Sequence, residues 1–334
     1  MSQPNVPPPQ MIRRLEEAVY PLFALYAAIR LDVFTPLATQ PMSSDELATT
    51  LGVDATKLGM LLYVLVNAGF LTVEDGRFAN GDEAAHYLVR GTPTYLRGLH
   101  SMWASGTFAE MLVTADSVRT GIAQAKKDYT EENSDALEAF LRGRNAMLRT
   151  NGGVFASRYD LSACHTLIDV GGGAGGFSIA LAEAYPHLRI MLADLPHVTE
   201  IAQQVISESG VGDRIETQVV DLLTEPPPGA FDAAVLCAFL QIFPVEEIRI
   251  ALRHVAAAIR PGGTIYILGQ MLDDSRLSPP SAVNGNLGFL NVYDGGQVYT
   301  EGEYRQWLRE AGFENVRRDA PLGQLTICIA DKAG

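Results

Sequence analysis

Two different spacings of apolar residues divide the chain near residue 160. Before this point, apolar positions recur roughly every three or four residues, which is typical of amphipathic helices. From about residue 163, short runs rich in aliphatic residues alternate with helical stretches that begin near Gly176, Val198 and Val245. This alternation predicts an α/β fold built on a Rossmann-like, doubly wound and mostly parallel sheet.

The apolar runs after residue 163 predict the strands of this sheet. They are TLIDV (166–170), RIMLAD (189–194), IETQVVD (215–221), FDAAVLCAF (231–239) and TIYILGQM (264–271). The last segment, residues 314–332, reads as two further strands joined by a turn at Leu322 and Gly323. An antiparallel hairpin should therefore close one side of the sheet.

The amino-terminal part predicts a small helical domain. Residues 11–38 read as a helix that a proline ends, and residues 42–88 as two short helices, a turn at Gly52, a third helix closed near Gly69 and a hairpin with an Asp-Gly turn. This order is winged-helix-like. Such layouts often bind DNA, but the segment is poor in Lys and Arg, which phosphate contacts need. Dimerisation is the favoured role.

Composition disfavours several classes of partner. The chain has 25 basic and 39 acidic residues, a net charge of −14, so neither nucleic acid nor an anionic membrane surface is an expected partner. No signal peptide or bilayer-length apolar run is visible, and we expect a cytoplasmic protein. The three cysteines, Cys164, Cys237 and Cys328, stand far apart without neighbouring histidines, so no disulfide and no metal site is expected.

A glycine-rich stretch, DVGGGAGG, follows the first strand of the α/β part. Gly171, Gly173 and Gly176 match the G-x-G-x-x-G pattern of nucleotide-binding turns, and Asp194 ends the next strand. A dinucleotide and S-adenosylmethionine are both compatible with this layout. The choice between them depends on the residues around the glycines.

Three features favour S-adenosylmethionine, which carries adenine, ribose and an ammonium group but no phosphate. Asp169, two residues before the first glycine, would repel a pyrophosphate at the helix start and attract an ammonium group. Asp221, at the end of the third strand, could recognise an adenine amino group. The closing hairpin is uncommon in nicotinamide-binding folds.

These motifs resemble those of the small-molecule methyltransferases that include caffeate and acetylserotonin O-methyltransferases and bacterial antibiotic methyltransferases. Besides the glycine stretch, FLRGRNAM, ADLP, IRPGG and VYTEGEYRQWLREAGF carry the resemblance, which covers nearly the whole chain. It implies a winged-helix-like dimerisation domain in residues 1–100, a helical linker lining the substrate pocket in residues 101–160, and an S-adenosylmethionine-binding catalytic domain in residues 161–334. A homodimer is the expected assembly.

Carried over by motif, the resemblance implies roles for particular residues. Asp194 would hold the ribose hydroxyls, Asp221 would face the adenine, and Met147 would lie near the transferred methyl. The expected cofactor-binding residues are Asp169, Gly171, Gly173, Asp194, Leu195, Asp221, Leu222 and Cys237. The expected substrate-binding residues are His100, Trp103, Arg142, Arg144, Met147, Phe289, Tyr293 and Tyr299.

The proton-accepting histidine of this family is replaced. The family carries a Leu-His-Asp-aromatic stretch after the fourth strand, and here CAFLQIFPVEE places Gln241 at the histidine's position. The two acids that orient the histidine in the family fall at Gly269 and Val298. Glutamine does not accept a proton near neutral pH, but it can orient a polar group by hydrogen bonding. Gln241 is the candidate catalytic residue in this orienting role.

A site without a base favours an acceptor that has no proton to lose. The main hypothesis is S-methylation of a thioether such as 4-methylthio-2-hydroxybutyrate, on the route to dimethylsulfoniopropionate, with Arg142 or Arg144 binding the carboxylate. The alternative is a C- or O-methyltransferase of secondary metabolism or pigments. A cofactor-retaining hydroxylase or pericyclase, and a non-catalytic regulator, also remain open.

Overall fold

The chain forms two compact units, residues 1–104 and 105–334, which are described separately. The computed structural model describes residues 7–92, 94–96, 107–126, 134–322 and 325–334. The helical stretch expected to link the domains belongs almost wholly to the second unit. In the described part of the chain no single helix is long and apolar enough to cross a membrane, and one sharply bent helix pair, 44–51 with 55–67, meets that test jointly.

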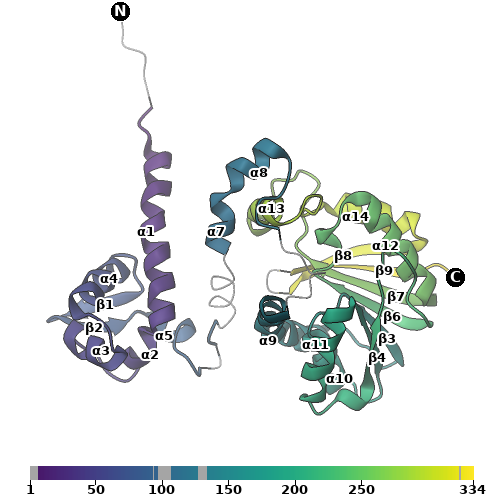
Figure 1. Cartoon of the computed structure of the whole chain (residues 1–334), viewed down its shortest axis with the longest axis horizontal. Coiled ribbons are helices and arrows are strands. Elements are labelled where there is room, and N and C mark those ends of the chain that lie inside the picture. Colours follow the sequence, from purple (N-terminus) through teal and green to yellow (C-terminus); the bar gives the residue numbers. More distant parts are fainter. Residues whose placement is uncertain (1–6, 93, 97–106, 127–133, 323–324) are drawn as a thin grey trace, which may run out of the picture. The chain divides into compact units, whose positions relative to one another are not determined.

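The first unit combines helices with a two-stranded hairpin (Figure 1). Its elements are α1 (Gln10–Leu31), α2 (Phe34–Leu37), α3 (Ser44–Leu51), α4 (Ala55–Asn67), β1 (Leu71–Glu74), β2 (Arg77–Asn80) and α5 (Asp82–Tyr87). Between residue 42 and the turn at Gly52 the structure has one helix, α3, where the sequence predicted two short helices. The hairpin is confirmed, and Asp75 (φ 48°) with Gly76 (φ 74°) takes the left-handed conformation that its two-residue turn requires.

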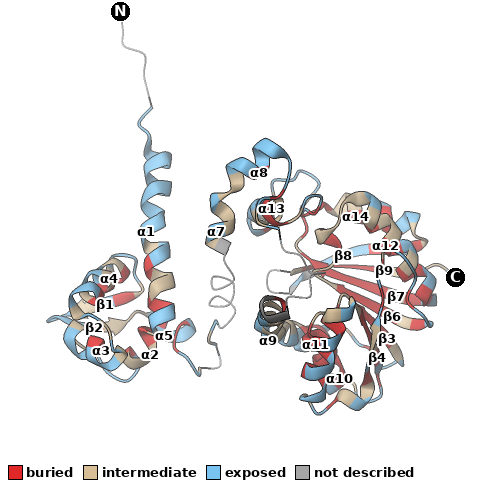
Figure 2. Ribbon diagram, in the orientation of Figure 1, coloured by how far each residue is buried: buried red, intermediate tan, exposed pale blue. Residues whose placement is uncertain are grey.

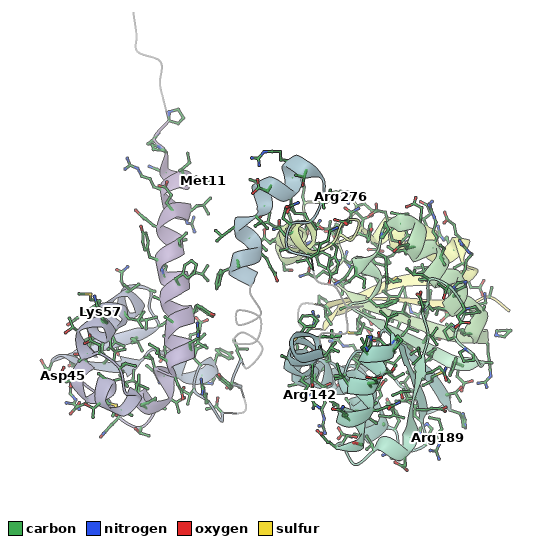
Figure 3. The ribbon with its side chains drawn as sticks, viewed as in Figure 1. Met11, Asp45, Lys57, Arg142, Arg189 and Arg276 are labelled. Carbon is green, nitrogen blue, oxygen red and sulfur yellow. The ribbon has the colours of Figure 1, made fainter. Side chains whose placement is uncertain are left out.

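Helix α1 carries an exposed apolar surface within the first unit. The helix ends at Leu31 because Asp32 turns left-handed (φ 61°), so it stops before the predicted proline and α2 forms a separate turn. The exposed large apolar side chains of α1 are Met11, Ile12, Leu15, Val19, Tyr20, Leu22, Phe23 and Leu31 (Figures 2 and 3). Contiguous exposed apolar surface of this kind marks an interaction site.

The second unit is an α/β sandwich with helices on both faces of one sheet (Figure 1). Its helices are α7 (Thr107–Leu112), α8 (Thr114–Thr120), α9 (Ser134–Arg158), α10 (Gly176–Ala184), α11 (Pro196–Ser207), η1 (Gly212–Arg214), η2 (Leu240–Ile242), α12 (Val245–Ala258), α13 (Pro280–Val292) and α14 (Glu301–Glu310). Its strands are β3 (Thr166–Val170), β4 (Arg189–Asp194), β5 (Ile215–Val219), β6 (Phe231–Cys237), β7 (Ile259–Gly269), β8 (Phe313–Leu322) and β9 (Leu325–Lys332).

The seven strands lie in the order β5-β4-β3-β6-β7-β9-β8. The pairings from β5 to β7 are parallel, and β9 runs antiparallel to both β7 and β8. The doubly wound sheet and its closing hairpin are therefore confirmed, and β3 and β4 have the predicted bounds. The chain crosses from β4 and β5 to the other side of β3, so the ends of β3 and β6 flank the point where winding reverses, where α/β sheets usually bind ligands.

Two apolar cores flank the sheet. The first contains α10, α11 and part of α9, and the second contains α12 and α14. Helix α9 packs closely on α10 because two glycines leave room: a Cβ on Gly152 would lie 2.8 Å from the Cβ of Ala180, and one on Gly176 would lie 2.5 Å from the backbone oxygen of Asn145. Helix α9 is thereby held against the start of α10, beside the glycine stretch.

Candidate active site

The expected cofactor residues lie at one edge of the sheet, at the carboxyl ends of neighbouring strands. Asp194 ends β4, the glycine stretch follows β3, and Cys237 ends β6. Gly171 (φ 67°) and Gly173 (φ 57°) turn the chain from β3 toward α10 in a conformation that residues with side chains rarely adopt. A cavity of about 470 Å³ lined by Arg189 and Asp213 lies away from this edge, near the starts of the strands.

Asp194 is fixed by two backbone amides. The N–H of Gly173 donates to Oδ2 at 2.9 Å and the N–H of Leu195 donates to Oδ1 at 2.8 Å. Burial raises the pKa of Asp194 to about 6, against the opposite effect of these two donors. Each oxygen keeps a further lone pair, so the carboxylate can accept two hydroxyl groups side by side, as a ribose presents them.

Asp169 is almost fully buried, and half of its carboxylate is unpaired. The Ser178 hydroxyl donates to Oδ2 at 2.6 Å, whereas Oδ1 has no hydrogen-bond partner among the described residues. Burial raises the pKa of Asp169 to about 6, and the nearby charge of Asp194 adds to the increase. A buried, unsatisfied carboxylate oxygen at this edge suits an ammonium group, as the sequence predicted.

Helix α9 supplies one wall of the glycine stretch, which the sequence did not predict in detail. A Cβ on Gly173 would meet, among the described residues, only Leu141 Cδ2 at 3.6 Å, so this glycine has open space beside it. Asn145 contacts the start of α10, and its buried Oδ1 also accepts no hydrogen bond from the residues that the structure describes. Two orphan acceptors, on Asn145 and Asp169, therefore lie beside the glycine stretch.

Gly171, which was expected to contact the cofactor, lies against an aromatic side chain of the protein. The ring of Phe239 fills the space beside it, because a Cβ at this position would lie 2.2 Å from Phe239 Cδ2. Ala238 precedes the ring and takes a left-handed conformation (φ 55°), which is strained for a residue with a side chain. An aromatic residue after β6 thus imposes glycine at 171, whereas Gly173 keeps the open side expected of a cofactor loop.

Gln241 lies in η2 and is only 7% exposed. Its Oε1 sits against Gly269, where a Cβ would lie 2.3 Å away, and its side-chain amide makes no hydrogen bond to any part of the chain that the structure describes. Val298 is fully buried in a small apolar cluster with Leu272 and Ala282. By the sequence resemblance, Gln241 thus puts a neutral amide at the position of the family's base. Gly269 and Val298 put no side chain and an apolar side chain at the positions of the two acids.

Two expected substrate residues contact other parts of the protein. Tyr299 is fully buried, and its hydroxyl donates to the backbone oxygen of Phe243 at 2.6 Å, so this side chain is part of the core. Arg142 bonds to Glu138 at 2.5 Å and to Gln204 at 3.2 Å, which commits its guanidinium to a surface network. Both polar groups thus have partners within the protein, and the substrate role of each residue stays a prediction.

The other expected site residues stay predictions, and the structure gives the following positions for them. Phe289 lies on α13 and Tyr293 directly follows this helix, with ring centroids 5.4 Å apart, and Met147 is exposed on α9. Asp221 is exposed after β5, with Leu222 buried beneath it. His100 and Trp103 lie outside the described residues. The sequence missed Ser178, Asn145 and Phe239, because no spacing rule marks residues that act only through contact with the glycine stretch.

Comparison with known proteins identifies the family. The family model described as "O-methyltransferase domain" matches residues 118–314, and the one described as "O-methyltransferase dimerisation domain" matches residues 17–90. The 3-hydroxy-5-methyl-1-naphthoate 3-O-methyltransferase of Streptomyces sahachiroi is 33% identical, with 94% of this chain and 92% of that protein aligned. The tetracenomycin polyketide synthesis 8-O-methyl transferase TcmO of Streptomyces glaucescens is 30% identical, with 97% of each aligned. The chain belongs to the O-methyltransferase family.

A solved structure agrees with this methyltransferase in fold. Human N-acetylserotonin methyltransferase in complex with S-adenosylmethionine has a TM-score of 0.81 and 23% identity, covering 99% of this chain and 100% of that chain. The chain is an S-adenosylmethionine-dependent methyltransferase, and the donors and acceptors around Asp169 and Asp194 fit that cofactor.

The comparisons correct the expected acceptor. Both curated relatives are named for methylation of an oxygen, so the thioether hypothesis and the dimethylsulfoniopropionate branch have no support. The alternative, a C- or O-methyltransferase, fits this methyltransferase better. Because methyltransferase activity follows from the family, the hydroxylase, pericyclase and regulator alternatives are set aside.

Proposed function

We propose that the chain transfers a methyl group to a hydroxyl oxygen of a small aromatic acceptor in secondary metabolism. The similarity to two O-methyltransferases, one acting by name on a hydroxynaphthoate and one in polyketide synthesis, supports this acceptor class. The single observation that carries the proposal is the matched length and sequence of the naphthoate enzyme, aligned over 94% of this chain.

The cofactor would be held by the edge residues already described. S-adenosylmethionine, when bound, supplies a methyl group on a positively charged sulfur that a lone pair can displace in line. Asp194 would accept hydrogen bonds from the ribose hydroxyls, and Asp169 and Asn145 offer unpaired acceptors to the ammonium group. The open side of Gly173 permits close approach to the backbone.

Gln241, Gly269 and Val298 stand where the family carries its base and two acids, and none of these three described residues can accept a proton. Gln241 can donate a hydrogen bond to an acceptor oxygen, but its amide cannot remove the proton. The hydroxyl therefore loses its proton to water before transfer. Bound S-adenosylmethionine would supply the methyl group to this oxygen, and its sulfur would keep the electrons of the broken C–S bond. The protein contributes alignment and exclusion of water.

The first unit would make the enzyme a homodimer. The matched dimerisation model and the exposed apolar side chains of α1 both support this assembly. A helix surface of this size is poorly soluble alone and is normally buried against a second chain.

An acceptor screen with ¹³C-methyl-labelled cofactor tests the proposed function. Hydroxynaphthoates and related hydroxyaromatic compounds are incubated with the purified protein, and the carbon chemical shift of the product distinguishes an O-methyl from a ring C-methyl group. An O-methyl product is expected. A ring C-methyl product would replace the oxygen acceptor by a carbon acceptor, and no labelled product from any hydroxyaromatic compound would overturn the proposal. Heat-treated protein serves as the blank.

A further inference from the structure

Helix α9 carries arginines on both of its sides: Arg142 and Arg149 form ion pairs in the described part of the chain, and Arg144 forms none there. Successive residues of a helix are about 100° apart, so residues two apart, such as Arg142 and Arg144, project to different sides. Leu141 and Asn145, four apart, form the face that contacts the glycine stretch. Arg142 and Arg144 then lie on opposite flanks of this contact face.

The Arg142 flank faces α10 and α11. Arg142 bonds to Gln204 of α11, and Arg149, on the same flank, forms an ion pair with Glu183 of α10. These helices follow β3 and β4 and share one core beneath that half of the sheet. The opposite flank of α9, with Arg144 and Met147, therefore faces the half of the sheet that holds β6 and β7.

Arg144 is not neutralised by the part of the chain that the structure describes. It forms no ion pair with any carboxylate among those residues, whereas Arg142 and Arg149 on the other flank are both paired. Its guanidinium carbon lies 5.3 Å from the centre of the Phe140 ring, a stacking contact that holds the group in place without neutralising it. Arg144 is also partly buried, which strengthens any interaction with an anion.

The charge of Arg144 acts at the carboxyl end of β6. Burial raises the pKa of Cys237, at the end of β6, to about 12, and Arg144 is near enough to oppose that increase. Cys237 is four residues before Gln241 and ends the strand beside β3. Arg144, with Met147 one turn further along α9, is thus on the side of the carboxyl end of β6, and η2 with Gln241 follows that strand in the chain.

We propose that Arg144 binds a carboxylate on the acceptor and so makes the enzyme selective for hydroxyaryl carboxylates. This inference rests on the proposed function, because it assigns a second group to the same acceptor. A planar guanidinium matches a carboxylate with two parallel hydrogen bonds, which fixes the orientation of a flat ring as well as adding affinity. The negative charge would lie on one side of the ring and the reacting hydroxyl on the other.

The test compares matched arginine variants on matched ligands. The probes are 3-hydroxy-1-naphthoate and 3-hydroxybenzoate, each paired with its methyl ester, which keeps the hydroxyl and removes the charge. Arg144→Gln should raise KM for the acids by about 10- to 100-fold and leave the esters within a factor of two, since a charge-assisted pair is lost only with the acid. Arg142→Gln is the control and should change neither, and Arg144→Lys should recover part of the effect.

Binding is measured by calorimetry on the S-adenosylhomocysteine complex, so the carboxylate contact is tested apart from turnover. Loss of acid binding in Arg144→Gln alone supports the inference. Equal binding of acids and esters by the unmodified protein, equal effects of the two glutamine variants, or no binding of any probe would overturn it. Selective binding of the acids without methyl transfer would uphold the Arg144 contact while overturning the proposed function.

Discussion

The Oε1 atom of Gln241 occupies the space that a side chain on Gly269 would need, with a Cβ at that position falling 2.3 Å from the oxygen. In the family these two positions hold a histidine and an acid that orients it. By this resemblance, the Gln241 amide takes the space that the orienting acid would need. We therefore predict that no base acts at this position.

Replacing Gly269 by alanine should force the Gln241 amide out of its seat. Overpacking of this kind costs ~1–3 kcal/mol in the free energy of unfolding. In a Gln241→Ala background the same change should cost less than half as much, because the obstructing oxygen is gone. Urea denaturation of the four proteins measures both costs. Equal costs in the two backgrounds would mean that Gly269 is constrained by another neighbour.

Adjacent glycines of α9 should respond in opposite directions. A Cβ on Gly152 would lie 2.8 Å from Ala180 Cβ and 3.0 Å from the backbone oxygen of Phe177, whereas one on Gly153 meets nothing within 4 Å. Gly152→Ala should therefore lower the free energy of unfolding by ~1–3 kcal/mol. Gly153→Ala should raise it by roughly 0.5–1 kcal/mol through helix propensity. Thermal and urea unfolding check the pair, and a shift of the same sign in both would refute the α9–α10 packing.

Asp194→Ala should weaken S-adenosylmethionine binding by ~2–3 kcal/mol, because the carboxylate's charge-assisted hydrogen bonds to the ribose are lost. Calorimetric titration with S-adenosylhomocysteine measures the change. Asp213→Asn, an acid at the other end of the strands, is the matched control and should bind normally. Unchanged affinity in Asp194→Ala would remove this residue from the cofactor site.

Asp169→Asn should stabilise the cofactor-free protein and weaken cofactor binding. Burial raises the folded-state pKa of Asp169 to about 6 from its ordinary value of 3.8, so its contribution to stability is greatest below pH 4 and is lost as pH rises through 6. At pH 7.5 the asparagine variant should gain ~1–3 kcal/mol in the free energy of unfolding, and less at pH 5. Urea denaturation of both proteins at the two pH values measures the difference. A lower free energy of unfolding for Asp169→Asn at pH 7.5 would contradict the account.

Sequence patterns predicted the parts of the structure that depend on local spacing. The strand bounds of β3 and β4, the hairpin turn at Asp75 and the closing pair of strands follow from alternation and turn residues, which act over a few positions. The carboxylates Asp169 and Asp194 were proposed from their spacing to the glycine stretch, and the structure places both beside it.

Side-chain contacts between segments far apart in the chain could not be predicted from the sequence. Tyr299 read as a pocket aromatic, but its hydroxyl reaches the backbone of Phe243, 56 positions away. The sequence alone could not distinguish Arg142 from Arg144. Only the structure shows that Arg142 forms an ion pair and that Arg144 lies over the Phe140 ring without a carboxylate partner among the described residues. The acceptor itself depends on the shape and charge of a whole pocket, and the thioether prediction, drawn from the missing histidine and its two missing acids, finds no support in the relatives.

The most direct test of the central claim is the pH dependence of kcat/KM at saturating cofactor for a series of hydroxyaromatic acceptors. If no protein group accepts the proton, the midpoint of each profile should equal the pKa of that acceptor's own hydroxyl in water and should shift with it along the series. A midpoint that stays at one pH for every acceptor would show that a base on the enzyme removes the proton, and would contradict the account.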